Sequence, residues 1–177
     1  SGGRVVPISS ETGPQHAMPM NGPYAMSKHA VEAYGDALRR ELMFLGMDVV
    51  LVQPGPFRTG MTAAILRNFQ ESTRPGSPFA AMASVMGEMA AGQDEVAGDP
   101  SVLAEKVWVA GTTRRPRHRY MVKWDLGRRL LDHLPVPVVD KALLLALRGK
   151  IAAREGEMQR EADEARRAMV EVAEHRT

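Results

Sequence analysis

A tyrosine and a lysine four residues apart, Tyr24 and Lys28, carry the clearest chemical signal in this sequence. In a helix this spacing places both side chains on one face, one turn apart. An ammonium group beside a phenol stabilises the ionised phenol, which can then exchange a proton with a substrate hydroxyl. The pair therefore suggests acid–base chemistry at an alcohol or a carbonyl, although chance also produces this spacing.

Two predicted strands and the helix between them must position this pair. The β-branched segment Arg4–Ser9 predicts a buried strand, in which Pro7 favours a strand end or an edge. Glycines and prolines across residues 11–23 predict a loop. Apolar residues then recur at helical spacing up to Gly46, and the apolar run Asp48–Gln53 predicts a strand covered on both faces. These segments form a βαβ unit with a right-handed crossover.

Small polar and turn-forming residues follow both predicted strands. Ser9 and Ser10 close the first strand, and Pro54-Gly55 closes the second. The carboxyl ends of parallel strands meet at one edge of a sheet, where ligands bind in open α/β folds. We therefore expect a serine hydroxyl to meet the phenol of Tyr24 at that edge.

The connection from residue 57 to residue 98 is long for a compact domain. It contains two short amphipathic pieces, Met61–Phe69 and Phe79–Met89. Connections of this length are usually lids or binding loops, and ordinary helix packing explains the same apolar residues equally well. Asp99 and Pro100 then begin a further helix, and His118–Val122 predicts a third strand.

The last part of the chain is predicted to be helical. Residues 126–147 are apolar but interrupted by Pro135 and Pro137, and their charged residues exclude a membrane span. Residues 150–177 predict a charged carboxyl-terminal helix. Its thin apolar stripe favours a solvated helix over one that pairs with another helix.

The composition excludes several classes of site. The 177 residues include no cysteine, which rules out disulfides, thiolate metal sites and a cysteine nucleophile. The five histidines lack metal-ligand spacing, so no metal is expected. A net charge of +2 is too small for a general nucleic-acid surface. We expect a cytoplasmic protein, whose 12 methionines suit an adaptable apolar pocket.

Three stretches, Gly3–Ser10, Tyr24–Ala30 and Pro54–Thr59, resemble the short-chain dehydrogenase/reductase family. Residues 22–42 are most similar to its branch that acts on retinoids and hydroxysteroids. The resemblance extends to about residue 125. It implies an α/β fold with a Rossmann-type doubly wound parallel sheet, of which this chain supplies the carboxyl-terminal half.

The domain organisation follows from this resemblance. Residues 1–149 would form the carboxyl-terminal part of the Rossmann domain, with residues 57–98 as the substrate lid, and residues 150–177 a separate charged helix. The chain begins with Ser1 and enters a predicted strand almost at once, as a fragment would. Such a fragment leaves an open strand edge, so we expect it to be poorly soluble or dependent on a partner.

The resemblance also assigns catalytic roles. Tyr24 would be the general acid/base, Lys28 would favour its ionised form, and Ser10 would hydrogen-bond the substrate oxygen. The spacing from Ser10 to Tyr24 is one residue longer than is usual in the family, which leaves Ser9 as the alternative. The substrate would be a small hydrophobic alcohol or ketone.

The cofactor implied by the resemblance is NAD or NADP. Tyr24 and Lys28 would hold the nicotinamide ribose, while Pro54, Gly55 and Thr59 would hold the carboxamide. The glycine-rich phosphate-binding turn, the family's catalytic asparagine and the residue that selects NAD or NADP have no counterpart. The activity is thus expected of a full-length parent, and the chain alone would be inactive. The alternative is a truncated, non-catalytic remnant that serves as an interaction or oligomerisation module.

Two surfaces suggest partners. By resemblance, the helix after Tyr24 would pair with its counterpart in a homo-oligomer. The second surface is a cluster of basic residues beside the apolar segment 126–147: Arg114, Arg115, Arg117, Arg119, Lys123, Arg128 and Arg129. A peripheral contact with an anionic membrane is one interpretation. A solvated strand edge is the favoured one.

Overall fold

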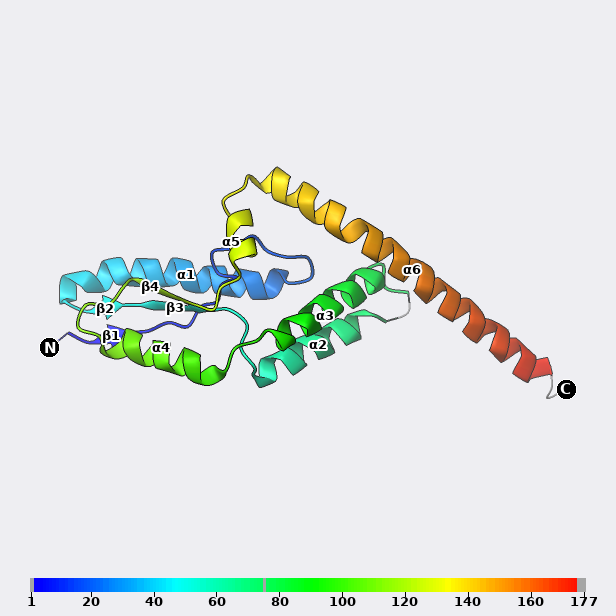
Figure 1. The fold of residues 1–177 in the computed structure, drawn as a ribbon, viewed down its shortest axis with the longest axis horizontal. Coiled ribbons are helices and arrows are strands. Elements are labelled where there is room, and N and C mark those ends of the chain that lie inside the picture. The colour runs from blue at the N-terminus through cyan, green and yellow to red at the C-terminus, as the bar shows by residue number, and fades with distance from the viewer. Residues whose placement is uncertain (1, 75, 175–177) are drawn as a thin grey trace.

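Parallel strands between helices form the body of the protein (Figure 1). The computed structural model describes residues 2–74 and 76–174. β1 (Arg4–Val5) pairs with β2 (Asp48–Val49), and β3 (Leu51–Pro54) pairs with β4 (Arg119–Val122). β2 and β3 are consecutive parts of one extended segment, so the two pairs form a single layer with residues 48–54 in the middle.

The first predicted strand is regular only at its start. Pro7 has no amide hydrogen to donate to the middle segment, so regular pairing ends at Val5. Individual contacts continue beyond it: Val52 N donates to Pro7 O at 3.0 Å, and Ser9 N donates to Val52 O at 2.8 Å. The extended path of residues 4–9 is therefore retained, and Ser9 and Ser10 still follow it at the carboxyl edge.

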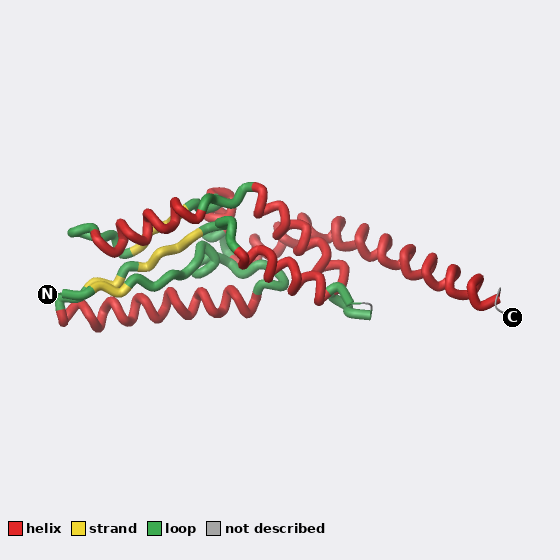
Figure 2. Tube along the Cα trace, turned by 90° about the horizontal axis from the view of Figure 1, so that it is seen from below, coloured by secondary structure: helices red, strands yellow, loops and turns green. Residues whose placement is uncertain are grey.

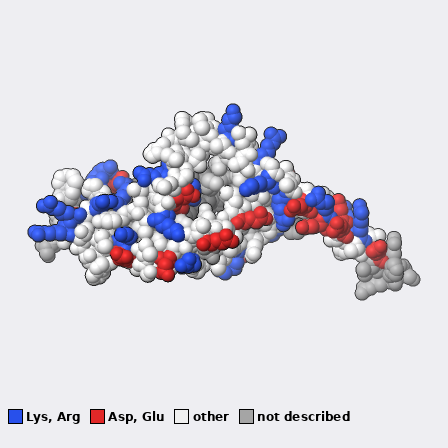
Figure 3. Space-filling model, viewed as in Figure 1, with Lys and Arg blue, Asp and Glu red and all other residues white. Residues whose placement is uncertain are grey.

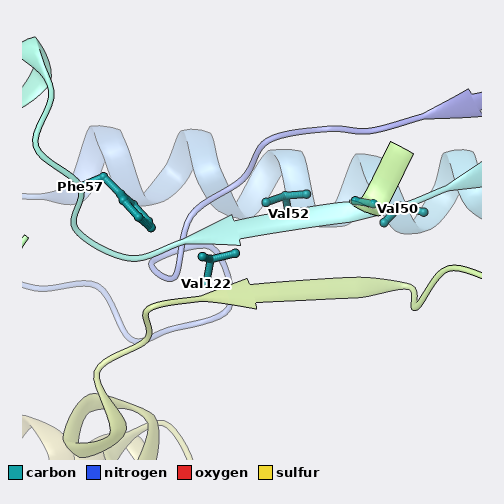
Figure 4. Close-up of a cluster of buried hydrophobic side chains, with 5 residues drawn as sticks. Val50, Val52, Phe57 and Val122 are labelled. Carbon is teal, nitrogen blue, oxygen red and sulfur yellow. The ribbon is translucent and has the colours of Figure 1, made fainter. Parts of the chain in front are cut away.

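Helices cover both faces of this layer (Figure 2). α1 (Gly22–Leu42) lies on one face and α4 (Pro100–Thr112) on the other. Side chains of a strand alternate between faces. Val50 and Val52 accordingly join an apolar cluster with Ala110 of α4, together with Phe57 and Val122 (Figure 4). On the opposite face, a Cβ added at Gly35 of α1 would meet the side chain of Leu51 at 2.8 Å, which shows how closely this helix approaches the sheet.

Capping residues end and begin these helices as predicted. A short 3-10 helix, η1 (Met43–Leu45), follows α1, and Gly46 adopts the left-handed conformation with φ of 67°. At the start of α4, the carboxylate of Asp99 accepts from Ser101 N at 2.8 Å, and Pro100 occupies the first turn. Both termini were correctly inferred from the sequence.

The segment after β3 folds into two helices, α2 (Gly60–Ser72) and α3 (Ala80–Glu95). They pack against each other, and α3 also packs against α6. The amphipathic pieces expected at 61–69 and 79–89 lie in these helices, except that Phe79 precedes α3, and both helices continue past the carboxyl ends of the pieces. Phe57 and Gly98 form a parallel bridge at the base of this segment, so its two ends are held together beside the sheet.

The carboxyl-terminal helices differ from the prediction in one respect. Pro135 separates α5 (Leu126–Leu131) from α6 (Val136–Glu174), but Pro137 lies in the first turn of α6, where no amide hydrogen is needed. α6 runs through Gly149 without a break, so the boundary predicted at 149/150 is not an interruption of the helix. Its distal half projects away from the body (Figure 1). None of the helices in the described ranges has the length and apolar character required to cross a membrane.

Candidate active site

Tyr24 and Lys28 lie in the first two turns of α1, where the sequence predicted them. The Lys28 ammonium lies 5.7 Å from the centroid of the Tyr24 ring. Lys28 Nζ also donates to Ile8 O at 3.4 Å, which ties the start of α1 to the end of the first extended segment. Both side chains are half-buried. The structure thus places a phenol beside a cation at the carboxyl edge of the sheet, with part of each open to solvent.

The two candidate serines occupy different environments. Ser9 Oγ donates to the backbone oxygen of Lys28 at 3.5 Å, so this hydroxyl faces α1. Ser10 Oγ donates to Thr12 Oγ1 at 3.4 Å and accepts from Thr12 N at 3.2 Å, within a tight turn. Both serines are buried. Among the contacts of the described residues, neither hydroxyl is hydrogen-bonded to Tyr24, and the geometry leaves the choice between them open.

Pro54 is the last residue of β3, and Gly55 and Thr59 follow it at the same edge. Gly55 N donates to Val122 O at 2.8 Å, and a Cβ at Gly55 would lie 2.0 Å from the backbone oxygen of Lys123. Only glycine fits where the two chains approach this closely. Thr59 is the N-cap of α2, and its Oγ1 accepts from Met61 N at 3.3 Å. In this structure Thr59 has a capping role, while its exposed position leaves it accessible to a ligand.

A buried carboxylate, Glu11, adjoins the candidate site and was missed by the sequence analysis. Glu11 N donates to Pro54 O at 2.8 Å, and Glu11 Oε1 lies 3.6 Å from the guanidinium of Arg128 in α5. Burial raises the pKa of Glu11, against the opposing effect of the Arg128 charge and a hydrogen bond from Asp125 N. Glu11 therefore links α5, through its side chain, to the end of β3 at Pro54, which its backbone amide contacts.

The loop between Ser10 and Tyr24 also contacts α5. His16 N donates to the carboxylate of Asp132 at 3.1 Å. Gln15 is only 1% exposed, and neither polar atom of its amide has a hydrogen-bond partner in this structure; the Nε2 atom of His16 is likewise buried and unpartnered. His16 lies in this loop, and its side chain as a whole is half-buried.

A polar network joins α1 to the sheet on the face that carries Tyr24. Gln53 Nε2 donates to Glu32 Oε1 at 2.8 Å, and Arg119 Nε donates to Glu32 Oε2 at 3.1 Å. Arg119 also donates to Asp36 Oδ1 at 2.8 Å. Burial acts to raise the pKa of Asp36, but its hydrogen bond and ion pair with Arg119 outweigh burial and lower it. This network fixes α1, and with it Tyr24, against β3 and β4.

Two methionines of the loop before α1 take part in a buried apolar cluster. Met18 and Met20, from the loop before α1, pack against a buried cluster of Val85, Met86 and Leu147. Phe69, Met82 and Ile151 complete the cluster. The helices of segment 57–98 and α6 thus meet the loop of the candidate site through flexible apolar side chains, which adapt readily to the shape of a bound molecule.

The sequence analysis identified site residues that are close to one another in sequence, such as Tyr24 and Lys28. It missed residues that become neighbours only when the chain folds. Glu11, Glu32 and Arg119 are far apart in sequence from their partners, and a charged side chain is normally assigned to solvent. One signal was present: the run Ser9-Ser10-Glu11-Thr12 is wholly polar, yet directly follows the segment predicted as a buried strand, which is half-buried to exposed in the structure. In the parts of the chain that the structure describes, no group of histidines and carboxylates could hold a metal ion.

Comparison with known proteins agrees with this geometry. Residues 1–69 match the family model described as short chain dehydrogenase. The chain is 40% identical over 122 residues to the NADPH-dependent 3-dehydrocapnine reductase of Ornithobacterium rhinotracheale, covering 68% of this chain and 41% of that protein. It is 31% identical over 159 residues to retinol dehydrogenase 7 of Mus musculus, covering 80% and 48%. The chain spans about half the length of the curated relatives that it matches.

A solved structure shows the same fold. A short-chain dehydrogenase from Streptomyces avermitilis matches with a TM-score of 0.50 at 22% identity, covering 92% of this chain and 52% of that one. Parallel strands between helical layers, with the candidate site at their carboxyl edge, define a Rossmann-type α/β protein. The chain belongs to the short-chain dehydrogenase/reductase family, a family of oxidoreductases that use NAD or NADP, and the predicted similarity to its retinol dehydrogenase-like branch is confirmed.

The described residues fit one end of such a cofactor. The half-buried ammonium of Lys28 and the phenol of Tyr24 are donors suited to a ribose hydroxyl, and they lie together at the strand ends. The sequence contains no Gly-x-x-x-Gly-x-Gly turn for the pyrophosphate. Lys28 and Tyr24 are therefore suited to the nicotinamide ribose of a dinucleotide. The sequence lacks the glycine-rich turn that would hold the phosphates.

Proposed function

We propose that this chain carries the catalytic residues of a nicotinamide-dependent oxidoreductase that interconverts a hydrophobic alcohol and its ketone or aldehyde. The observation that carries the proposal is the pairing of Tyr24 with Lys28, at 5.7 Å from ring centroid to ammonium, at the carboxyl edge of a parallel sheet. A half-buried phenol beside a cation is suited to moving a proton to or from a substrate oxygen.

The chain's own residues would divide the work as follows. In the reductive direction the Tyr24 hydroxyl donates its proton to the carbonyl oxygen, and the Lys28 cation stabilises the phenolate that forms. In the oxidative direction the phenolate takes the proton of the alcohol. Ser10, or Ser9, donates a hydrogen bond to the same oxygen once its hydroxyl turns from its present partner. When bound, NAD or NADP accepts or supplies the hydride.

The groups around this pair would position the reactants. We propose that Pro54, Gly55 and Thr59 hold the nicotinamide carboxamide and that residues 57–98 form the substrate lid of a domain spanning residues 1–149. The apolar cluster that joins Met18 and Met20 to α3 and α6 supports a hydrophobic substrate. One relative points to a cofactor: the Ornithobacterium reductase is NADPH-dependent, so NADPH is the first cofactor to test.

The experiment compares Tyr24→Phe with Tyr34→Phe in a protein that combines this chain with a glycine-rich phosphate-binding segment. Tyr34 lies on the same helix, and 63% of it is exposed. Loss of a general acid/base lowers kcat by about 10²–10⁴-fold, so Tyr24→Phe should show this loss while NADH or NADPH binding, followed by fluorescence, survives. Tyr34→Phe should leave turnover unchanged. Near-normal turnover of Tyr24→Phe would falsify the mechanism.

Single substitutions also separate the two serines. Ser9→Ala and Ser10→Ala are assayed in the same protein for kcat with a hydrophobic alcohol. The serine that contacts the substrate oxygen should lower kcat when replaced, and the other should affect stability alone. Equal kcat for both variants and the unaltered enzyme would remove serine from the mechanism. The non-catalytic alternative is not favoured, because the relatives named above are a reductase and a retinol dehydrogenase.

A further inference from the structure

The surface over α5 and the first half of α6 is unusually apolar. Eight large side chains there are exposed: Leu126, Leu130, Leu131, Leu134, Val136, Val138, Leu144 and Leu145. Soluble proteins rarely leave such a continuous set in water unless it contacts a partner or a membrane. In Figure 3 this part of the surface is largely white, with Lys and Arg side chains along its border.

The two sides of α6 differ in what they present. Val139 and Leu147 are buried and face the body of the protein. A helix turns by about 100° per residue, so Val138, Lys141, Leu145 and Arg148 lie on the opposite side. That outward side combines apolar residues with cations. Between Val136 and Lys150 the only acidic residue is Asp140, against the basic residues Lys141, Arg148 and Lys150.

α5 is fastened to the body next to the candidate site. Arg128 pairs with Glu11 at 3.6 Å, and Asp132, just after α5, accepts from His16 N at 3.1 Å. Arg129 lies over the ring of Trp124, 5.9 Å from its centroid. The exposed leucines of α5 are thus held on a rigid support beside the loop that follows Ser10.

We propose that this surface, α5 with residues 134–150, docks on an anionic lipid bilayer. The helices would lie in the interface plane, with the leucines in the acyl boundary and Lys141 and Arg148 at the headgroup phosphates, as amphipathic interfacial helices do. The bilayer contact would place the candidate site close to a source of hydrophobic molecules. The predicted basic cluster contributes only in part, because Arg114, Arg115 and Arg117 precede β4 and lie at its far end from α5.

Charge favours a lipid surface over a second copy of the chain. In a twofold contact the same patch faces itself, so Lys141 and Arg148 would meet the cations of the other copy with Asp140 as the only acid. Anionic headgroups complement this patch, and a second copy repels it. The proposal stands on this surface alone and is independent of the reaction at Tyr24.

The test measures co-sedimentation of the full chain with lipid vesicles. One set of vesicles contains phosphatidylcholine with about 30% phosphatidylserine, and the other contains phosphatidylcholine alone. Binding is expected to the anionic vesicles and to weaken from about 0.05 M to about 0.5 M salt. Leu145→Glu should lower the partition coefficient by about tenfold or more. The matched control is Leu45→Glu in η1, because Leu45 is 71% exposed and Leu145 is 72% exposed; it should bind as the unaltered chain does.

A second pair of variants leaves the apolar side chains intact. Lys141→Glu and Arg148→Glu should each weaken binding to anionic vesicles by about fivefold, while Arg40→Glu on α1 should not. Circular dichroism checks that each variant keeps its helices. The proposal is overturned if the chain binds neither vesicle, if Leu45→Glu loses binding as strongly as Leu145→Glu, or if the chain is a dimer that only Leu145→Glu dissociates.

Discussion

Glu11 is a carboxylate that the fold buries beside Ser10, between two strand ends and α5. Its position is explained by what it joins: the backbone at Pro54 on one side and the guanidinium of Arg128 on the other. An ionised group in such a place is stabilised by its partners and penalised by burial. Since burial is the larger effect, the pKa of Glu11 is raised. The ionisation of the Glu11 carboxyl therefore makes the stability of the protein depend on pH.

The pH dependence of Glu11 can be measured by substitution. A raised pKa means that the folded state holds its proton more tightly than the unfolded state, so stability is greatest below the ordinary pKa of 4.5 and falls as pH rises through the folded-state pKa. Glu11→Gln removes this titration. The free energy of unfolding of the variant, minus that of the unaltered chain, should increase from about pH 4 to about pH 7 in urea titrations.

A matched control is Glu105→Gln, an exposed carboxyl on α4. Because Glu105 is exposed, Glu105→Gln controls for the effect of a Glu-to-Gln substitution at a surface position. A difference that decreases with pH for Glu11→Gln would show that the pairing with Arg128, and not burial, dominates.

Among the elements, α1 is the one whose placement decides the site. It is held by packing at Gly35 and by a polar network in which Arg119 of β4 reaches Glu32 and Asp36. Glu32 is 8% exposed and, among the side-chain hydrogen bonds of the described residues, would retain its bond from Gln53 alone if Arg119 were removed. The last strand of the sheet therefore helps to fix the helix that carries Tyr24.

The strength of this link is testable by a double-mutant cycle. Arg119→Met should lower the free energy of unfolding by about 1–3 kcal/mol, the usual worth of hydrogen bonds to charged groups, reduced here because Arg119 is 37% exposed. Adding Glu32→Gln should recover part of the loss, which gives a coupling energy of about 0.5 kcal/mol or more. Arg114→Met, at an exposed loop position, is the control and should change stability little. Strict additivity of the two substitutions would contradict the link.

The elements themselves were largely predictable, because they follow from local patterns. Asp99 and Gly46 marked helix ends through capping and a left-handed turn, and the apolar run before Pro54 marked the middle strand. The serine contacts were not predictable, because Ser10 bonds to Thr12 only once the turn has formed. Pro137 was misread as a break because its effect depends on where α6 begins. The partners of Glu32 and Arg119 required the tertiary fold.

At the scale of the whole molecule, the first extended segment (residues 4–9) forms one edge of the sheet. In the described part of the chain, Val5, Pro7 and Ser9 bond to the middle segment, whereas the amides of Val6 and Ile8 point the other way. An unpaired strand edge is a template for pairing with another chain. The expectation from sequence that the chain is poorly soluble or depends on a partner stays a prediction, and this edge gives it a physical reason.

Amide hydrogen exchange distinguishes these two sides of the segment. The amides of Val50 and Val52, which donate to Val5 and Pro7, should be protected at every protein concentration. The amides of Val6 and Ile8 should exchange quickly in dilute solution and gain protection as concentration rises, if the edge pairs between copies. Protection of Val6 and Ile8 that is independent of concentration in a monomer, measured by light scattering, would contradict an open edge.

The alternation of residues 50–53 has a consequence for how the chain assembles. If this segment slipped by one residue against its neighbours, every side chain would change faces. Gln53 would then enter the apolar cluster around Phe57, and Glu32 would lose its amide donor. Wrong alignments are penalised on both faces at once, so the correct one becomes stable only when α1 and α4 are both in place. The helix that carries Tyr24 therefore also helps to select the correct strand register of the sheet.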